Sequence, residues 1–322
     1  MPSPPLIVEL TRGPAVESRH AVHAVLMNGR GDVTASYGDA ERPTYPRSSI
    51  KPLQAIALVE TGAAAAFGLS NAEIALACAS HSGEEKHTAT AGGWLARIGL
   101  DENALECGAH APYASPSSPP CVLCNNCSGK HSGMVTLSMF LNAPVAGYID
   151  PAHPAQHKIL STVGEICGVQ ITPQTLGVDG CSAPNPVMPL ASMAHGFASF
   201  MQPDSLGILR GTACRHLYQA MVEHPDLVGG TGRLDTALMS AAKGKIMCKV
   251  GGEGVYACAV PGKDTAIALK VEDGNIRAAQ AALFALLEKY KLADDSVLEA
   301  VRNICLPVQK NWRGIEVGVI RI

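Results

Sequence analysis

The sequence has no uninterrupted apolar run long enough to cross a lipid bilayer. Its most apolar segment with a helical pattern, residues 53–69, contains Gln54 and Glu60, whereas a spanning helix needs about 20 mostly apolar residues. The sequence also lacks a basic cluster or a basic stripe studded with aromatic residues. Aromatic residues make up only 4% of it, and 25 Lys and Arg are outnumbered by 28 Asp and Glu. We therefore expect neither a membrane span nor a nucleic-acid partner.

The N-terminus has neither the basic nor the apolar region of a secretory signal peptide, since it begins Met-Pro-Ser-Pro-Pro. We therefore expect a soluble, cytoplasmic protein. Its 11 cysteines are an odd number and leave no complete disulfide framework. In a reducing compartment we expect these thiols to stay reduced, and some of them are then available as metal ligands.

Hydrophobic residues are plentiful at 47%, and charged residues are scarce at 16%. This balance is typical of a compact globular protein and argues against a disordered one. A chain of 322 residues can bury a large core and favours two lobes.

Strand-like patterns lie near both ends of the chain, and helical patterns lie between them. Apolar alternation and β-branched residues predict strands at residues 6–11, 20–27, 246–250, 254–260, 265–272 and 315–322. Helical periodicity predicts helices at residues 49–63, 71–79, 84–98, 131–141, 154–167, 187–200, 205–222, 233–242 and 275–290.

This order predicts an α/β (α+β) fold, in which the N- and C-terminal strands form one antiparallel sheet with flanking helices and a helical lobe. We expect a single catalytic unit over residues 1–322, with a sheet lobe at about 1–47 and 245–322 and a helical lobe at about 48–244. Ser48 then lies where the lobes meet, which is a natural place for a cleft.

Ser48 precedes Lys51 by three residues at the start of a predicted helix. On helical spacing the two side chains share a face, so the lysine amine can come within hydrogen-bonding reach of the hydroxyl. An amine with a lowered pKa can serve as the base that activates a serine nucleophile. The alternative interpretation is a helix-capping serine beside a surface lysine.

Two further motifs follow in the chain. Ser80-His81-Ser82-Gly83 follows a predicted helix, and it is either a proton-relay loop or an ordinary helix-ending turn. Lys249, before two glycines on a late strand, either places its ammonium beside a nucleophile and an oxyanion site or is a solvated strand lysine. In order, Ser-x-x-Lys, Ser-x-Ser and Lys-x-Gly reproduce the three-part arrangement of serine β-lactamases and penicillin-binding proteins.

A cysteine-rich segment lies before the helix predicted at residues 131–141. Cys121, Cys124 and Cys127 have a spacing that could bind zinc, and Cys181 from a distant loop could complete the site. Unliganded buried cysteines are the alternative.

Five motifs together resemble the Rhizobium etli-type L-asparaginases (asparaginase II). They are residues 47–52, 80–83, 126–131, 178–181 and 249–254, and the likeness continues to residues 312–318, so that it covers essentially the whole chain. The resemblance implies a serine-β-lactamase-like fold, hydrolysis of L-asparagine to L-aspartate and ammonia, and a homodimer. It also implies two Ser–Lys pairs, Ser48 with Lys51 and Ser80 with Lys249.

The resemblance further implies a zinc (Zn2+) site with Cys127, Lys130 and Cys181 as ligands. His131 and Asp179 are then candidates for residues that contact these ligands without binding the metal. A lysine ligand must be neutral to donate its lone pair, so the cation has to lower the pKa of Lys130. Cys121 and Cys124 fall outside this ligand set. We expect substrate contacts from a further group of residues: Arg47, His81, Ser82, Gly252 and Glu253.

Two positions near the late strands need comment. Lys263 is a second candidate for the late lysine, but it occupies a tight turn that suits a solvated charge, so we prefer Lys249. Val250 stands where the family more often has threonine or glycine, which removes any hydroxyl contact there.

These motifs lead to one mechanistic hypothesis. Lys51 takes the proton of Ser48 as Ser48 attacks the side-chain amide of asparagine, and Ser80 with Lys249 relays a proton to the departing ammonia. Because serine supplies the nucleophile, a zinc-bound hydroxide is not needed. The alternatives are a β-lactamase-like or penicillin-binding-like serine acyl-transfer enzyme, and a non-enzymatic metal or thiol sensor.

Overall fold

The computed structural model describes residues 3–322, which fall into two compact units. The first, here called the sheet unit, comprises the residues up to Ser49, Met188–Met201 and Arg233–Ile322. The second, the helical unit, comprises Ile50–Val187 and Gln202–Gly232. These bounds differ from the expected lobes, because residues 188–201 and 233–244 pack within the sheet unit. That the chain acts as a single catalytic unit stays a prediction.

The sheet unit is built on one antiparallel sheet in which strands from both ends of the chain are neighbours. The seven-stranded sheet has the order β13-β1-β2-β10-β9-β8, and β3 pairs with β2 off this path. The strands are β1 (Leu6–Arg12), β2 (Ala15–Met27), β3 (Val33–Tyr37), β8 (Met247–Val250), β9 (Val255–Val260), β10 (Thr265–Val271) and β13 (Ile320–Arg321). Pairing of β2 with β10 places Val25 opposite Ala268. The predicted fold class, mixed α/β with a sheet of N- and C-terminal strands, is therefore confirmed.

Strand β2 begins at Ala15, well before the apolar alternation indicates. In this first half Glu17 and Arg19 form ion pairs with Arg12 and Glu9 of the neighbouring strand β1. Cross-strand charge pairs support a strand as apolar pairs do. Because these side chains are polar, the sequence pattern does not show the strand there.

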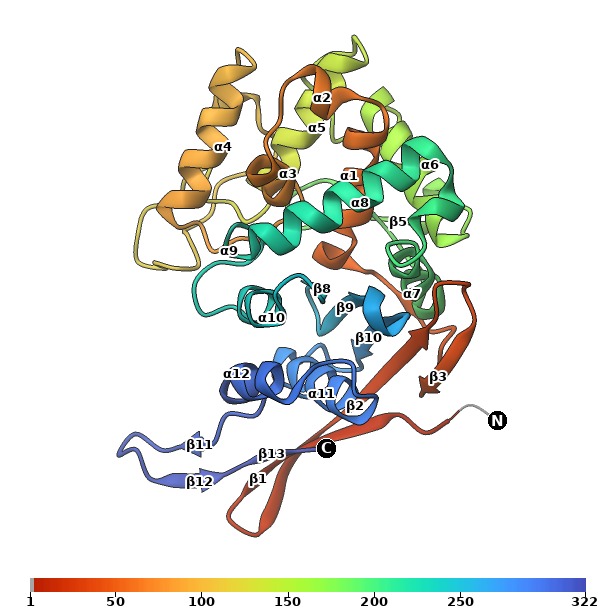
Figure 1. Cartoon of the computed structure of the whole chain (residues 1–322). Coiled ribbons are helices and arrows are strands. Elements are labelled where there is room, and N and C mark those ends of the chain that lie inside the picture. Colours follow the sequence, from red (N-terminus) through yellow and green to blue (C-terminus); the bar gives the residue numbers. More distant parts are fainter. Residues whose placement is uncertain (1–2) are drawn as a thin grey trace. The chain divides into compact units, whose positions relative to one another are not determined.

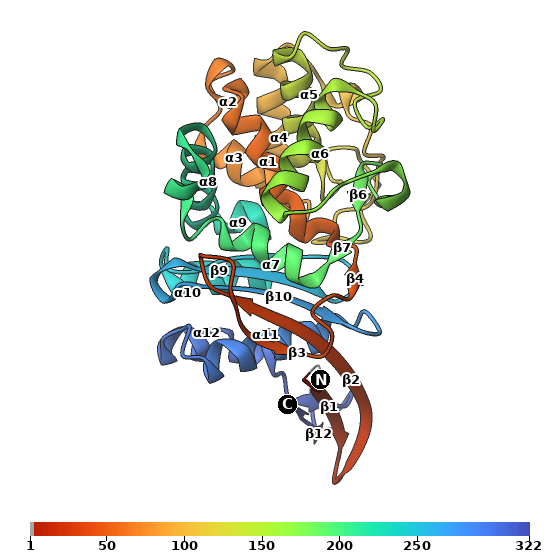
Figure 2. The ribbon, with the colours of Figure 1, turned by 90° about the vertical axis from the view of Figure 1, so that its right-hand side faces the viewer.

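Helices cover both faces of this sheet. Figure 2 shows α7 (Leu190–Ala198) on one face and α11 (Ile276–Lys289) on the other, with α12 (Asp295–Cys305) beside α11. Helix α10 (Leu234–Ala242) packs against α12 and β8. Every residue of β9 is buried because both sides of the central strands are covered.

Several short elements complete the sheet unit. They are β4 (Pro43–Thr44), paired with β7 (Met188–Pro189), the hairpin of β11 (Gln309–Lys310) and β12 (Glu316–Gly318), and two 3-10 helices, η5 (Pro261–Lys263) and η1 (Arg47–Ile50), whose last residue belongs to the helical unit.

The other helices of the helical unit pack around helix α1, as Figure 1 shows. Its helices are α1 (Lys51–Glu60), α2 (Ala63–Ala66), α3 (Asn71–Ala77), α4 (Glu85–Arg97), α5 (Ser128–Phe140), α6 (Pro154–Cys167), α8 (Ile208–Glu223) and α9 (Pro225–Val228), with 3-10 turns η2 (Glu102–Ala104), η3 (Pro173–Thr175) and η4 (Pro203–Leu206). A short hairpin pairs β5 (Leu176–Val178) with β6 (Pro184–Pro186). Helix α1 packs against α5, α6 and α8, and all its residues from Lys51 to Leu58 are buried. A lysine inside such a helix needs polar partners.

Capping residues set the ends of these helices. The Ser70 hydroxyl accepts the Glu73 N–H, and the Glu73 carboxylate accepts the Ser70 N–H, which is the reciprocal capping pattern that begins α3. Helix α6 ends at Gly168, whose φ of 65° is the left-handed conformation that glycine adopts readily. Within residues 3–322, no helix has both the length and the apolarity that crossing a membrane requires.

Candidate functional site

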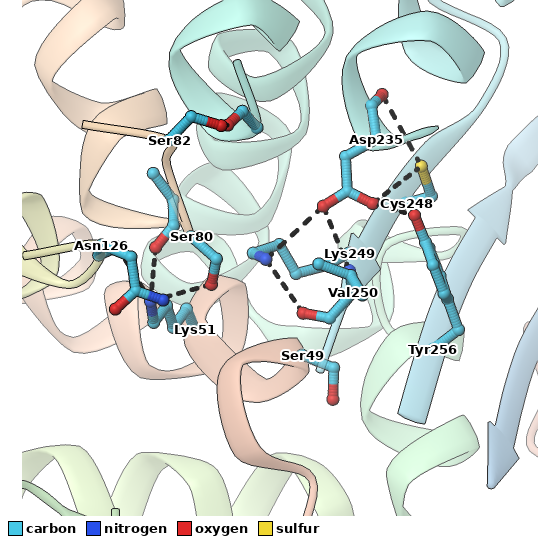
Figure 3. Close-up of polar contacts among 12 residues, drawn as sticks. Ser49, Lys51, Ser80, Ser82, Asn126, Asp235, Cys248, Lys249, Val250 and Tyr256 are labelled. Carbon is cyan, nitrogen blue, oxygen red and sulfur yellow. Dashed lines mark hydrogen bonds and ion pairs between the residues drawn. The ribbon is translucent and has the colours of Figure 1, made fainter. Parts of the chain in front are cut away.

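Lys51, the first residue of α1, is almost completely buried, with 1% of its surface exposed. Its Nζ atom donates to the Ala79 carbonyl oxygen at 2.5 Å, lies 3.0 Å from Ser80 Oγ and 3.4 Å from the Asn126 carbonyl oxygen. Figure 3 shows Lys51, Ser80 and Asn126 meeting in this way. Three segments of the helical unit therefore converge on one amine: the start of α1, the loop after α3 and the turn before α5.

This contact bears on the two predicted Ser–Lys pairs. The structure places Lys51 against Ser80, a contact that the sequence did not predict. Ser48 and Lys249 belong to the sheet unit, whereas Lys51 and Ser80 belong to the helical unit. The pairings of Ser48 with Lys51 and of Ser80 with Lys249 stay predictions.

The loop that carries Ser80 is held by hydrogen bonds on both sides. The Ser80 N–H donates to the Val228 carbonyl oxygen at 3.0 Å, and Ser82 Oγ donates to the Gly229 carbonyl oxygen at 3.1 Å. Ser80 and Ser82 are both buried, each 4% exposed. The loop therefore presents Ser80 to Lys51 from a fixed backbone.

His81 lies inside the helical unit and is fully buried. Its Nδ1 accepts the Gly83 N–H at 3.1 Å, so Nε2 carries the proton and donates to Ser128 Oγ at 2.9 Å. The ring also stacks on His87 with centroids 4.8 Å apart. These contacts give His81 a supporting role for the loop, while the substrate contact expected of it stays a prediction.

Two cysteines and a lysine meet at the first turn of α5. Lys130 Nζ donates to Cys181 Sγ at 2.9 Å, and the thiols of Cys127 and Cys181 share a hydrogen bond. All three side chains are buried. Helix α5 begins at Ser128, earlier than predicted, so Lys130 lies on its first turn with Cys127 as the residue before the helix. The structure thus brings together the three residues expected to bind zinc.

The charges in this cluster are strongly coupled. The hydrogen bond with Cys181, together with the cations of Lys51 and Lys130, holds the pKa of the Cys127 thiol well below its usual value despite burial. Burial alone lowers the pKa of Lys130, but the attraction of Cys181, Cys127 and Asp179 outweighs it and raises that pKa. Lys130 and the two cysteines therefore shift one another's pKa values.

His131 lies on α5, next to Lys130 and near Cys181. Its Nδ1 is hydrogen-bonded to Tyr148 Oη at 2.6 Å, and burial lowers its pKa to about 4, so the imidazole is neutral near pH 7. Its Nε2 is buried and makes no hydrogen bond with the described residues within normal geometry, although the Cys181 thiol is near enough to act on its pKa. The expectation that His131 supports the zinc ligands without binding the metal stays a prediction.

Cys181 is presented by a tight turn between β5 and β6. The Asp179 N–H donates to the Ala183 carbonyl oxygen at 3.0 Å, the Ser182 N–H donates back to the Asp179 carbonyl oxygen at 2.9 Å, and Ser182 has a φ of 70°. The Asp179 carboxylate accepts the Gly180 N–H at 2.8 Å and an Asn185 amide N–H at 3.4 Å. Asp179 therefore orders the turn and also acts electrostatically on Lys130.

The donor atoms of this cluster suit zinc. Two sulfurs and a nitrogen, from Cys127, Cys181 and Lys130, are atom types that bind zinc, and these side chains are buried. In residues 3–322 no three His, Cys, Asp or Glu side chains are grouped to hold a metal ion. A zinc site here would consequently depend on the lysine as a ligand.

A disulfide joins Cys121 and Cys124, whose Cα atoms are 5.1 Å apart. The expectation that all thiols stay reduced is wrong for this pair, because the turn between them brings the Cys124 N–H to Cys121 Sγ and the two side chains together. The other nine cysteines are buried and form no disulfide with one another. That Cys121 and Cys124 lie outside a zinc ligand set stays a prediction.

In the sheet unit, Lys249 on β8 is fully buried and pairs with a carboxylate that the sequence motifs did not indicate. Its Nζ lies 3.5 Å from Asp235 Oδ2 and donates to the Val250 carbonyl oxygen at 2.9 Å. Asp235, on α10, is 2% exposed and also accepts the Tyr256 hydroxyl proton and, at 3.2 Å, the Val250 N–H. Figure 3 shows this cluster. A lone aspartate in the first turn of a helix belongs to no catalytic motif. The sequence alone therefore gives no reason to single out Asp235, whereas its burial in the structure does.

The turn that carries Ser48 packs on the glycines after β8, within the same unit. A side chain at Gly251 would bring its Cβ to 2.5 Å from the Pro46 carbonyl oxygen, and one at Gly252 would lie 3.4 Å from the guanidinium carbon of Arg47. Only a glycine leaves room at position 251. Ser48, half-buried on η1, and Gly252 therefore belong to one packed substructure.

Arg47 and Glu253 both have left-handed backbones, with φ values of 51° and 56°. Such conformations are uncommon for residues other than glycine and often mark functional loops. The Glu253 carbonyl oxygen accepts a hydrogen bond from Lys270 Nζ at 2.7 Å. The structure places both residues next to the glycines of this substructure, and their substrate contacts stay predictions.

The sequence model of the L-asparaginase II family matches residues 8–322, so the chain belongs to this family. This confirms the family resemblance drawn from the motifs and makes the protein an amidohydrolase. No curated protein matches the sequence.

Solved structures similar to this chain include a β-lactamase from Mycobacterium bovis, with 16% identity, 84% of this chain and 94% of that chain covered, and a TM-score of 0.46. Others are a protein named Mglu (15% identity, 84% and 67% covered, TM-score 0.49) and simvastatin synthase from Aspergillus terreus in a mutant form (10% identity, 77% and 86% covered, TM-score 0.41). Likenesses at this level carry no functional argument.

Proposed function

We propose that the protein is an L-asparaginase, which hydrolyses the side-chain amide of L-asparagine to L-aspartate and ammonia with Ser48 as the nucleophile. The observation that carries the proposal, beyond family membership, is the buried contact of Lys51 Nζ with Ser80 Oγ at 3.0 Å. A buried amine against a serine hydroxyl is the arrangement that serine–lysine acyl transfer needs.

Lys51 Nζ faces three oxygen atoms of the helical unit. It donates to the carbonyl oxygens of Ala79 and Asn126 and to Ser80 Oγ, so the proposal requires that Lys51 gives up one proton before it acts as a base. A neutral lysine can accept a proton, whereas an ammonium cannot. We therefore assign the base to Lys51 and a proton-relay role to Ser80.

The proposed hydrolysis has two steps, acylation of Ser48 and hydrolysis of the resulting ester. Ser48 Oγ bonds to the amide carbon and its proton passes to Lys51. Lys51 returns that proton through Ser80 to the amide nitrogen as the carbon–nitrogen bond breaks, which releases ammonia and leaves an aspartyl ester on Ser48. Water then attacks the ester, gives a proton to the Ser80–Lys51 pair, and aspartate leaves as Ser48 is reprotonated. Backbone N–H groups of Ser48 and Gly252 are the proposed oxyanion donors, each worth about 3 kcal/mol in other enzymes.

A zinc ion held by Cys127, Lys130 and Cys181 is part of the proposal. The lowered pKa of Cys127 supports metal binding, because a thiolate is the form that binds zinc. When bound, zinc would supply a Lewis acid for orienting the α-amino or α-carboxylate end of the substrate. Asp179 and His131 hold the turn and the helix that carry these ligands.

One assay tests the proposal against its alternatives. Ammonia release is measured from asparagine and glutamine, and ring opening from a β-lactam, each with and without a chelator. The proposal requires ammonia from asparagine that is lost in Ser48→Ala. Turnover of the β-lactam alone would indicate a β-lactamase-like acyl-transfer enzyme, and no turnover with tight metal binding would indicate a sensor.

We further propose that the enzyme acts as a homodimer in the cytoplasm. Light scattering during size-exclusion chromatography measures the mass in solution, and a monomer at micromolar concentration would contradict the first part. Fractionation of the source cells tests the second part.

A further inference from the structure

Asp235 is a buried carboxylate that the proposed mechanism leaves without a role. It lies on α10, and four neighbours from β8 and β9 surround its side chain. Oδ2 accepts the Val250 N–H at 3.2 Å and lies 3.5 Å from Lys249 Nζ, while Oδ1 accepts the Tyr256 hydroxyl proton and lies 4.0 Å from Cys248 Sγ. Figure 3 shows these groups converging on Asp235.

These contacts supply donors to both oxygens of Asp235, as an ionised carboxylate requires. Oδ2 receives the Val250 N–H and lies beside Lys249 Nζ, and Oδ1 receives the Tyr256 hydroxyl proton. Burial, together with the charge of Asp235, raises the pKa of Tyr256 well above its usual value, so the phenol stays protonated and donates.

An ionised carboxylate in such a buried place needs a cation, and Lys249 is the cation beside it. Lys249 is 0% exposed and Asp235 is 2% exposed. Removal of one partner from a buried ion pair leaves an uncompensated charge, which is strongly unfavourable. The pair therefore holds Lys249 as an ammonium and restrains where its Nζ lies.

We propose that Asp235 is a positioning residue that keeps Lys249 charged, so that Lys249 acts as a cation in amide hydrolysis and not as a base. The catalytic part of this inference rests on the proposed function. It restricts the choice of the general base, because a charged Lys249 cannot take the proton of Ser48. That proton must go to Lys51.

The charge state of Lys249 can be measured without turnover. In protein labelled with ¹³C at lysine Cε, the Lys249 resonance is assigned by its loss in Lys249→Arg and followed from pH 6 to pH 11. In the wild type we expect it to report the ammonium throughout the neutral range. In Asp235→Asn we expect its titration midpoint to fall by at least about one pH unit, since the carboxylate no longer stabilises the charge.

The kinetic consequence is a shift in the alkaline limb of the pH profile. In Asp235→Asn, kcat/KM for asparagine should begin to fall at a pH about one unit lower than in the wild type, with KM changed less than kcat. When Asp235→Asn is added to Lys249→Arg, the alkaline limb of the double variant should coincide with that of Lys249→Arg alone, because arginine stays charged. Glu60→Gln, which removes a carboxylate from an ion-pair network in the helical unit, is the control for general destabilisation and should not move the limb.

Two results of the titration would contradict the inference. The first is a Lys249 midpoint below about pH 8 in the wild type, which can be measured even if Asp235→Asn does not fold. The second is an unchanged Lys249 titration in folded Asp235→Asn. If the wild type releases no ammonia from asparagine, the proposed function fails, whereas the resonance experiment still decides whether Asp235 holds Lys249 charged.

Discussion

Lys51 and Ser80 are hydrogen-bonded at 3.0 Å although they lie 29 positions apart in the chain. Both side chains are buried, at 1% and 4% exposure, so water does not compete for this contact. Through its hydrogen bonds, the Lys51 amine connects α1 to the loop after α3 and to the turn before α5.

Removal of the Ser80 hydroxyl should therefore impair proton transfer and leave the fold intact. Ser80→Ala is expected to lower kcat for asparagine about 10²- to 10⁴-fold, which is the usual worth of general acid–base catalysis. Lys51→Met should cost at least as much. Stopped-flow measurement of ammonia release gives kcat, and thermal unfolding checks the fold. A Ser80→Ala enzyme with wild-type kcat would show that the contact is structural.

The glycine at position 251 should be irreplaceable, because its missing side chain makes room for the turn that carries Ser48. In Gly251→Ala the new Cβ would lie 2.5 Å from the Pro46 carbonyl oxygen and 2.9 Å from Val255 Cβ. We expect a loss of about 1–3 kcal/mol in unfolding free energy and a sharp fall in kcat. Urea unfolding and steady-state kinetics measure the two effects.

Gly262→Ala is the matched control, since a Cβ at Gly262 meets no atom within 4 Å. This variant should behave as wild type in both measurements. Equal behaviour of the two alanine variants would refute the packing argument for position 251.

Metal content should follow the cysteines that the structure groups with Lys130. Cys181→Ser is expected to lose most of about one bound zinc per chain, because one of two thiolate ligands is gone. The double variant Cys121→Ser, Cys124→Ser should keep its zinc, since those sulfurs form a separate disulfide. Elemental analysis by mass spectrometry after dialysis measures both, and equal zinc content in the two variants would rule out the assigned ligand set.

Glu60 should contribute stability at neutral pH that acid removes. The carboxylate is buried and forms ion pairs with Lys158 and Arg210 at 2.8 Å. Burial alone would raise its pKa, but hydrogen bonds from Arg210, Lys158 and Thr162 outweigh burial and lower it. A carboxyl whose folded pKa is below its unfolded value stabilises the fold above the unfolded value, near 4.5, and loses this effect as the pH falls through the folded pKa.

Glu60→Gln is therefore expected to destabilise the protein by about 1–3 kcal/mol at pH 7 and by progressively less below pH 4.5. Urea unfolding at a series of pH values measures the difference. Glu17→Gln is the control, because its pair with Arg12 is exposed at the surface and such pairs contribute little. A difference between Glu60→Gln and wild type that does not depend on pH would contradict this account.

Local sequence patterns predicted much of the fold. Helix α6 lies where its periodicity indicated, and the predicted pairing of terminal strands is present between β2 and β10. Helix α12 was missed although Val297, Leu298, Val301 and Cys305 recur at helical spacing and are buried. Short amphipathic segments need a tertiary partner to be recognised, and here α10 and α11 supply it.

The site was predictable where its residues are close in the chain or belong to a motif. Cys127, Lys130 and Cys181 were grouped through the family resemblance, whereas spacing alone grouped Cys121, Cys124, Cys127 and Cys181. The contact of Lys51 with Ser80 depends on how α1 and α3 pack, which no spacing in the sequence encodes. Asp235 was missed because an isolated aspartate becomes informative only when its burial is known.

The most direct test of the central claim is to find which serine carries the acyl group. Enzyme mixed with excess asparagine is quenched in acid within milliseconds, digested, and analysed by mass spectrometry. The account predicts one aspartyl ester, located on the peptide that contains Ser48 and absent in Ser48→Ala, which should also release no ammonia. An ester located on Ser80, or a Ser48→Ala enzyme with undiminished turnover, would contradict it.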